Sequence, residues 1–342
     1  MEAFNYGHCE KYLTTAGGLK ETIDKYGVAI IHQVISDQEC EEMLTGIWNY
    51  FEHLTQKWDK PLDRNNRDTW REFYKLMPLH SMLVQFFGVG HAQISWNLRQ
   101  NPKIVNIFAT LWNVTPEELL VSFDGLSFNF PPEITNKGYF RPKKCTELAG
   151  TELEQNGISW LHSDQSYVDS NFQCVQSWIT ALDVNSDDAT LLLLEGSNKY
   201  HEEFAQRYQI TDKDDWYKLT ESEVKFYVKD KECFPVRITC SKGSMVFWDS
   251  RTIHCGCEAI KGRADPKFRA VIYLCYLPRK GTSEANLRKK KKAFEESRTT
   301  KHNPQKSLLF GKFPRSYGEP IPEVTVINKP ILTDLGLKLA GY

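Results

Sequence analysis

The chain has 342 residues, of which 41% are hydrophobic and 25% are charged. That balance excludes a disordered protein and allows a sizeable core. The 43 basic and 44 acidic side chains leave a net charge of −1, which argues against a surface that binds nucleic acid or an anionic membrane as a whole. No fixed-period repeat or low-complexity linker divides the chain, so residues 1–342 are predicted to form a single domain.

The cysteine content and the N-terminus predict a cytoplasmic protein. Nine cysteines, an odd number with irregular spacing, indicate reduced thiols rather than a disulfide framework. The N-terminus shows no basic segment followed by an apolar run, so no secretory signal is expected. No apolar stretch reaches the length of about 18 residues that a membrane-spanning helix needs.

Residues 1–115 are predicted to form a helical layer around one strand. A short helix over 19–26 ends at Gly27, and an apolar strand follows over 28–34. Ser36 is placed to cap the next helix, in which apolar residues recur every three or four positions. These residues are Met43, Ile47, Tyr50 and Phe51. Another helix is expected over 101–112.

Residues 56–90 are polar, and a loop with short helical turns is expected there. The segment from Thr69 to Trp96 carries several aromatic side chains. Its aromatic residues could cover a substrate, although about half of them are expected to be plain core residues.

From residue 119 to residue 280, short apolar runs separated by turns predict a series of strands. The runs are 119–130, 175–182, 189–194, 236–239, 244–248 and 268–277. Many short strands with long connections favour a mainly β fold of the jelly-roll type with helical additions. A charged helix over 284–298 and a loosely structured C-terminal wrap complete the prediction.

Three residues carry the candidate chemistry: His162, Asp164 and His254. Residues two apart on an extended strand point to the same face, so His162 and Asp164 can reach one ion. His254 could join them from a facing strand of a jelly roll. Two imidazoles and one carboxylate form a facial triad that suits Fe(II) and leaves open positions. On spacing alone this pattern is weak, because a lone histidine is often satisfied within the core.

Arg269 is the candidate for binding an anionic ligand. It begins an apolar strand, where an unpaired guanidinium would be costly. A bound carboxylate would be a natural partner, because guanidinium binds carboxylates in bidentate geometry. A structural salt bridge is the alternative. Arg263 is a rival, but it lies in a loop segment and is expected to be solvated.

Four stretches share their order and spacing with a known family. They are WLHSDQSY (160–167), residues 178–201, GSMVFWDSRTIHCG (243–256) and FRAVIYLCYLP (268–278). Together they resemble the phytanoyl-CoA dioxygenase-like (PhyH) family of Fe(II)- and 2-oxoglutarate-dependent oxygenases. The second stretch departs from the family pattern, with Glu195 in place of a proline and Asn198 in place of a histidine.

The resemblance implies a double-stranded β-helix core over about 119–280 and a 2-oxoglutarate-dependent dioxygenase. Such an enzyme uses O2, with ascorbate as an accessory reductant, to hydroxylate an organic substrate while 2-oxoglutarate becomes succinate and CO2. The resemblance assigns the catalytic iron to His162, Asp164 and His254, and the far carboxylate of 2-oxoglutarate to Arg269. Asp164 further implies hydroxylation, because related halogenases lack this carboxylate.

Other co-substrate contacts are carried over by position. Trp178 and Leu126 fall where the family has residues of the 2-oxoglutarate pocket. The family often has a hydroxyl-bearing residue two positions after the second histidine, and this chain has Gly256 there. Thr190 or Gln176 could supply the missing hydrogen-bond donor.

Several alternatives stay open at the level of sequence. The same iron centre could serve a nucleobase or protein-side-chain hydroxylase, or the chain could be a non-catalytic metal-binding scaffold. The intact triad and Arg269 argue against the scaffold. A small-molecule substrate is the expected partner, while the substrate itself and the oligomeric state are not encoded in any recognisable pattern.

Two other candidate sites are disfavoured. The lack of a C-x-x-C pair argues against zinc at Cys233, Cys240, Cys255 and Cys257. The basic run 288–292 is expected to be a solvated helix face rather than a site for phosphate or nucleic acid.

Overall fold

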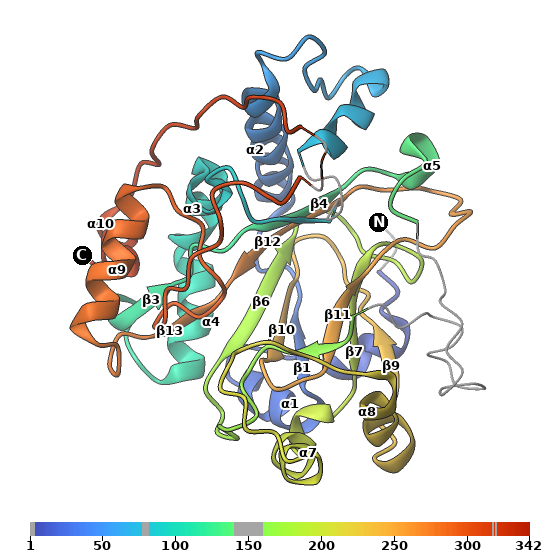
Figure 1. Cartoon of the computed structure of the whole chain (residues 1–342), viewed down its shortest axis with the longest axis vertical. Helices are drawn as coiled ribbons and strands as arrows, with labels where there is room; N and C mark the ends of the chain where they lie inside the picture. The colour runs from blue at the N-terminus through green and yellow to red at the C-terminus, as the bar shows by residue number, and fades with distance from the viewer. Residues whose placement is uncertain (1–3, 77–81, 140–159, 317, 319) are drawn as a thin grey trace.

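The protein is built on two antiparallel β-sheets that face each other inside a layer of helices (Figure 1). The architecture comes from a computed structural model, which describes residues 4–76, 82–139, 160–316, 318 and 320–342. The larger sheet has six strands and the smaller sheet has five. The expected double-stranded β-helix core with helical additions is confirmed.

The strands of the larger sheet are ordered β1-β10-β6-β12-β4-β2 and those of the smaller sheet β8-β5-β11-β7-β9. Along the chain, β4, β6, β10 and β12 of the larger sheet alternate with β5, β7 and β11 of the smaller sheet, which is the winding of a jelly roll. The larger sheet comprises β1 (Val28–Ile31), β10 (Met245–Asp249), β6 (Val175–Thr180), β12 (Arg269–Leu274), β4 (Leu126–Asn129) and β2 (Leu83–Val84). The smaller sheet comprises β8 (Tyr217–Lys218), β5 (His162–Ser163), β11 (His254–Cys257), β7 (Thr190–Leu194) and β9 (Pro235–Arg237).

The two faces of the larger sheet meet different layers because side chains alternate along each strand. On β6, Trp178 packs between the sheets in a cluster that includes Leu191 and Leu193 of the smaller sheet. Val175 and Ile179 point the opposite way and join the cluster that contains the helical layer. The inner face therefore provides the space for a site, and the outer face provides the main hydrophobic core.

The first helix has the predicted bounds, and the second begins where the sequence predicts. Helix α1 (Leu19–Tyr26) ends at Gly27, whose φ of 77° lies in the left-handed region that favours glycine. Helix α2 (Asp37–Thr55) begins with a capping box between Ser36 and Glu39. Its predicted apolar stripe is fully buried.

The apolar face of α2 covers the outer face of the larger sheet, with the Trp48 ring centroid 5.7 Å from that of Phe128 on β4.

The remaining helices are η1 (Gly7–Tyr12), η2 (Arg67–Lys75), η3 (Val89–His91), α3 (Gln93–Arg99), α4 (Pro102–Trp112), η4 (Pro116–Glu118), α5 (Pro132–Thr135), η5 (Ser197–Tyr200), α7 (His201–Tyr208), α8 (Glu221–Lys225), η6 (Phe226–Asp230), α9 (Glu284–Glu295) and α10 (Asp334–Ala340). Among the described residues, no helix is both long and apolar enough to cross a bilayer.

The structure corrects several predicted elements. The runs 119–130 and 268–277 are each split between two strands, because β3 (Leu119–Val121) and β13 (Tyr276–Pro278) leave the larger sheet and pair with each other. Helices α3 and α10 were not predicted. Helix α10 packs against β3 and α9, so the C-terminal wrap ends in an ordered helix (Figure 1).

Candidate metal centre

Two histidines lie opposite each other at the inner face of the smaller sheet. His162 on β5 and His254 on β11 are direct register partners in the antiparallel pair. Their ring centroids are 4.4 Å apart. His254 was expected to come from a facing strand of the jelly roll. Instead, β11 is the hydrogen-bonded neighbour of β5 in the same sheet.

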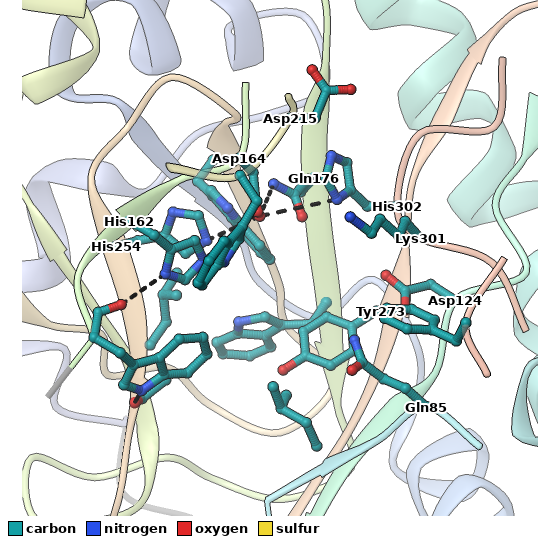
Figure 2. Close-up of a pocket in the computed structure, with 18 of the residues that line it drawn as sticks. Gln85, Asp124, His162, Asp164, Gln176, Asp215, His254, Tyr273, Lys301 and His302 are labelled. Carbon is teal, nitrogen blue, oxygen red and sulfur yellow. Dashed lines mark hydrogen bonds and ion pairs between the residues drawn. The ribbon is translucent and has the colours of Figure 1, made fainter. Parts of the chain in front are cut away.

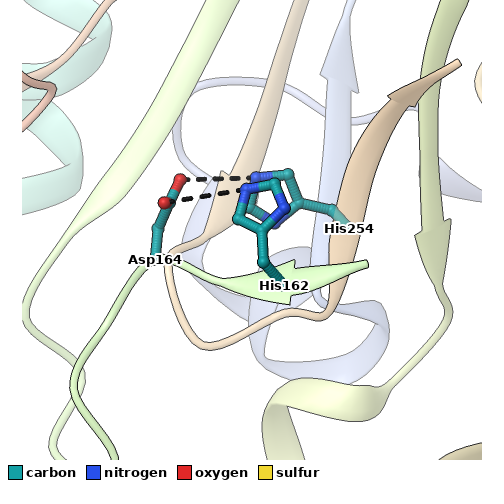
Figure 3. A group of neighbouring side chains, drawn as sticks. All are labelled: His162, Asp164 and His254. Atoms are coloured by element: carbon teal, nitrogen blue, oxygen red, sulfur yellow. Dashed lines mark ion pairs between the residues drawn. The ribbon is translucent and has the colours of Figure 1, made fainter. Parts of the chain in front are cut away.

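The third member of the group is Asp164, which lies one residue beyond the end of β5. Its main-chain N–H donates to the Ser250 carbonyl over 3.0 Å, which fixes the backbone as it leaves the strand. The carboxylate faces both imidazoles (Figure 3), with Asp164 Oδ1 3.7 Å from His162 Nε2 and Oδ2 3.4 Å from His254 Nε2. One ligand atom from each of the three residues lies within 4.8 Å of the others, a spacing that one metal ion can bridge.

The main chain orients both imidazoles for metal binding. His162 Nδ1 bonds to the Trp160 carbonyl and His254 Nδ1 to the Thr252 carbonyl, each over 2.9 Å. A carbonyl can only accept, so each Nδ1 carries the proton and each Nε2 keeps its lone pair. Burial, followed by the neighbouring His254, lowers the pKa of His162 to about 4, so its imidazole is neutral at physiological pH, as a ligand must be.

Asp164 is held in its ionised form by its surroundings. Burial alone would raise the pKa of Asp164, but His302 and the two paired histidines outweigh burial and hold the pKa well below its ordinary value. Gln176 Nε2 also donates to Asp164 Oδ2 over 2.8 Å. The donor set and its orientation fit a divalent iron ion.

A cavity of about 290 Å³ opens from the three residues into the space between the sheets (Figure 2). Trp160 stacks on His162 with ring centroids 4.8 Å apart, and Trp216 lies on another side of the same ring at 5.9 Å. The cavity wall also contains Trp178 and Trp248. The buried indole N–H groups of these last two residues have no hydrogen-bond partner in the described part of the chain.

Arg269 lies in this cavity wall and is 5% exposed. It donates from Nε to Ser127 Oγ and from a terminal nitrogen to the Ala189 carbonyl, each over 2.9 Å. Both acceptors are neutral, and among the described residues no carboxylate forms an ion pair with Arg269. The alternative of a structural salt bridge is therefore not supported, and the guanidinium fits the far carboxylate of 2-oxoglutarate.

Arg263, the rival anion-binding residue, is not solvated as expected. It forms ion pairs with Glu133 over 2.7 Å and with Asp188 over 2.6 Å, and its side chain is only 5% exposed. These contacts neutralise Arg263 and tie the loop to neighbouring elements, so it is not available for a ligand.

The other predicted co-substrate residues divide into two groups. Trp178 and Gln176 line the cavity, although Gln176 is committed to Asp164. Leu126 packs in the outer core with the helical layer, and its neighbour Ser127 is the residue of β4 that contacts Arg269. Thr190 donates to the Ile238 carbonyl over 2.7 Å and does not line the cavity, so it does not supply the missing donor.

Gly256 lines the cavity at the position where the family often has a hydroxyl. A Cβ atom built there would lie 2.4 Å from the end of the Met82 side chain. A larger residue would require Met82 to move. In this chain the space is used for close packing.

Several cavity residues have no signal in the sequence. His302, Lys301 and Phe310 come from the C-terminal segment, which crosses the cavity beside the metal ligands. His302 Nδ1 lies 4.0 Å from Asp164 Oδ2. Asp124 and Gln85 complete the side away from the metal (Figure 2). None of the five lies in a recognisable motif. All five lie in loops, where the sequence has no helix or strand periodicity.

Neither disfavoured site gains support. Among the described residues, the triad is the one group of at least three His, Cys, Asp or Glu gathered closely enough for a metal, so the cysteines form no zinc cluster there. In the basic run 288–292, Lys290 departs from the expected solvated face: it is 1% exposed and contacts the Val121 carbonyl and the Phe123 ring.

The aromatic residues between Thr69 and Trp96 mostly belong to the core. Trp70 and Trp96 are both buried in the main cluster, and no described aromatic residue of that segment lines the cavity. Leu83 and Gln85 reach it instead.

Comparisons with known proteins agree with the resemblance found in the sequence. The family model "Phytanoyl-CoA dioxygenase (PhyH)" matches residues 145–258, a range that includes the three candidate metal ligands. The chain is 24% identical over 302 residues to Ava biosynthesis cluster protein O of Aspergillus versicolor, covering 85% of this chain and 87% of that protein. It is 26% identical over 146 residues to a putative phytanoyl-CoA dioxygenase of Dictyostelium discoideum, covering 41% and 37%.

Among solved structures, a hypothetical protein from Escherichia coli has a similar fold. The TM-score is 0.53 at 12% sequence identity, and the match covers 97% of this chain and 85% of the other. Nearly the whole chain, including the helical layer, therefore follows a known arrangement.

Proposed function

We propose that this chain is an iron- and 2-oxoglutarate-dependent oxygenase of the phytanoyl-CoA dioxygenase-like family, which its matches to that family support, and that it hydroxylates a small organic molecule. 2-Oxoglutarate is converted to succinate and CO2 in the same reaction. The observation that carries the proposal is the convergence of His162, Asp164 and His254 at one end of a cavity that also contains Arg269.

In the proposed site, His162 Nε2, His254 Nε2 and one Asp164 oxygen bind Fe(II). Gln176 holds the second Asp164 oxygen and so restricts rotation of the carboxylate. The backbone carbonyls on the two Nδ1 atoms fix the imidazole tautomers. With three ligands from the protein, the remaining positions on the metal stay open for a co-substrate and dioxygen.

Arg269 receives the far carboxylate of 2-oxoglutarate in this proposal. Arg269 is buried in the cavity wall, where a charge-assisted hydrogen bond is stronger than in water. The guanidinium carbon also lies 5.4 Å from the Trp178 ring centroid. When iron, 2-oxoglutarate and O2 are bound together, the centre supplies the oxidising power needed to convert a C–H bond into C–OH.

The cavity walls favour a small-molecule substrate. Their aromatic side chains, Trp160, Trp216 and Phe310, exclude water from the reacting atoms and offer flat apolar contacts. We propose that residues 1–342 work as a single domain, in which both sheets, the helical layer and the C-terminal segment contribute to one site.

The test compares the wild type with His162→Ala and Asp164→Ala. Purified protein is given Fe(II), ascorbate, 2-oxoglutarate and a cell extract, and mass spectrometry follows succinate and products that have gained one oxygen atom. Wild type is expected to form both, and the two variants to lose both together with bound iron. His32→Ala is the matched control, because His32 is exposed; it should retain iron and turnover.

Two outcomes would refute the proposal. One is succinate formation by the wild type that does not depend on iron or O2. The other is an Asp164→Ala variant that binds iron and forms product as the wild type does. A wild type that binds iron but forms no succinate with any extract would favour the non-catalytic scaffold.

A further inference from the structure

A second carboxylate lies in the cavity, on the side away from the metal ligands. Asp124 stands in the segment between β3 and β4, is 8% exposed and belongs to the cavity wall. Figure 2 shows its side chain directed toward the interior of the group of residues drawn, near Tyr273. Its position suits contact with a substrate and not with the metal.

In the described part of the chain, the hydrogen-bond partner of the Asp124 carboxylate is a neutral N–H group. Oδ1 accepts a hydrogen bond from the Gly125 N–H over 2.7 Å. Arg99 approaches most closely, but it donates to the main-chain oxygen of Asp124 over 2.6 Å and not to the carboxylate. Among the described residues, none forms an ion pair with this carboxylate, and His302 pairs with Asp164 instead.

Other carboxylates of this region are neutralised, which makes Asp124 distinctive. Asp215, also in the cavity wall, forms an ion pair with Lys306. Asp188 pairs with Arg263. An isolated carboxylate taken out of water is costly unless a cation or several donors compensate it. Burial accordingly raises the pKa of Asp124.

We propose that Asp124 binds a cationic nitrogen of the substrate, a protonated amine or a guanidinium. This inference rests on the proposed function, because it assumes that the cavity holds a substrate. A nitrogen cation would supply both the missing charge and hydrogen bonds to the open carboxylate oxygen. The aromatic walls would contact the apolar part of the same molecule, and cations also interact favourably with such rings.

Lys301 is the competing cation within the protein. It lines the same cavity, but no ion pair joins its ammonium group to Asp124. If Lys301 turned onto Asp124 in solution, the carboxylate would already be neutralised and would show no preference for a charged ligand. A measured preference therefore separates these two possibilities.

The experiment uses three probes with one apolar body: phenethylamine, 2-phenylethylguanidine and 2-phenylethanol. Their binding to the full-length protein loaded with Fe(II) and 2-oxoglutarate is measured by calorimetry at neutral pH without O2. We expect at least one of the two cations to bind about tenfold or more tightly than the alcohol. The stronger of the two identifies the kind of nitrogen that the site prefers.

Asp124→Asn removes the charge but keeps an oxygen for the Gly125 N–H. We expect the cations to lose their advantage in this variant, while the alcohol binds unchanged. Asp215→Asn is the matched control and should keep the preference, because that carboxylate is already paired. The inference is overturned if the alcohol binds the wild type as tightly as the cations, if neither cation binds at millimolar concentration, or if Asp124→Asn keeps the preference.

Succinate formation is followed separately on the same preparations. Its absence in the wild type would refute the proposed function while the probe affinities could still be compared. Succinate formation without any preference for cations would refute the inference alone.

Discussion

Gln176 donates a hydrogen bond from its amide nitrogen to the Oδ2 atom of Asp164 over 2.8 Å. The same nitrogen lies 3.3 Å from Ser250 Oγ, so the amide is held on two sides. A carboxylate fixed in this way presents its other oxygen in a constant direction. Gln176 thus links the larger sheet, through β6, to a metal ligand supplied by the smaller one.

Replacing this amide should weaken metal binding without altering the fold. We expect Gln176→Leu to raise the dissociation constant for Fe(II) by about tenfold to a hundredfold, a usual effect for a residue that supports a metal ligand. Anaerobic titration with Fe(II) measures it. Gln38→Leu, on the exposed face of α2, is the control. An unchanged iron affinity in Gln176→Leu would show that Asp164 is held by other contacts.

Substitution of the two buried arginines should have different consequences. Arg269→Met is expected to weaken 2-oxoglutarate binding by about a hundredfold, or about 3 kcal/mol, and to leave iron binding intact. Arg263→Met leaves Glu133 and Asp188 unpaired, so it should lower the free energy of unfolding by about 3 kcal/mol. Calorimetry with 2-oxoglutarate and urea denaturation distinguish the two. Equal loss of 2-oxoglutarate binding in both variants would contradict the assignment of Arg269.

Variants of Leu126 and Ser127 test the different roles of the two faces of β4. Leu126 is fully buried in the outer core, so Leu126→Ala should lower the free energy of unfolding by about 3 kcal/mol. Its KM for 2-oxoglutarate should not change. Ser127→Ala removes the acceptor of Arg269 Nε and should raise that KM several-fold with little loss of stability. The reverse pattern would place Leu126 in the co-substrate pocket after all.

His91 should make the protein sensitive to mild acid. Burial lowers the pKa of His91 to about 3, whereas an unfolded histidine has a pKa of about 6.5. Between these values the unfolded state binds a proton that the folded state does not, so stability falls as the pH falls. The slope is at most about 1.4 kcal/mol per pH unit.

Urea denaturation at pH 6.5 and at pH 5 tests this. The wild type should lose up to about 2 kcal/mol from His91 over that interval, and His91→Gln should lose correspondingly less. The Gln side chain can still donate to the Arg298 carbonyl that His91 Nε2 contacts. An identical pH dependence in the two proteins would show that His91 becomes protonated without unfolding.

Much of the fold could be predicted because its signals are local. Ser36 and Glu39 are three residues apart and form a capping box, and short apolar runs form strands wherever both faces of a sheet are covered. His162 and Asp164 could be grouped because they are neighbours in sequence. His254 could be added because a jelly roll brings distant strands together.

The remaining features depend on packing between distant segments. The choice between Leu126 and Ser127 depends on the face of β4, and a run of buried residues on both faces gives no alternation to read. His302 reaches Asp164 from an irregular segment with no periodic pattern. Lys290 looks solvated in the basic run, but its place in the core depends on how α9 rests on β3.

The C-terminal segment that carries Lys301, His302 and Phe310 has a consequence for biosynthesis. The last strand of the two sheets, β12, ends at Leu274, so a growing polypeptide can form the barrel before residues 301–310 are synthesised. The cavity wall still lacks those three side chains at that stage. A ribosome-bound chain at that stage would therefore present an open barrel, and the finished chamber would exist only after residues 301–310 have left the exit tunnel.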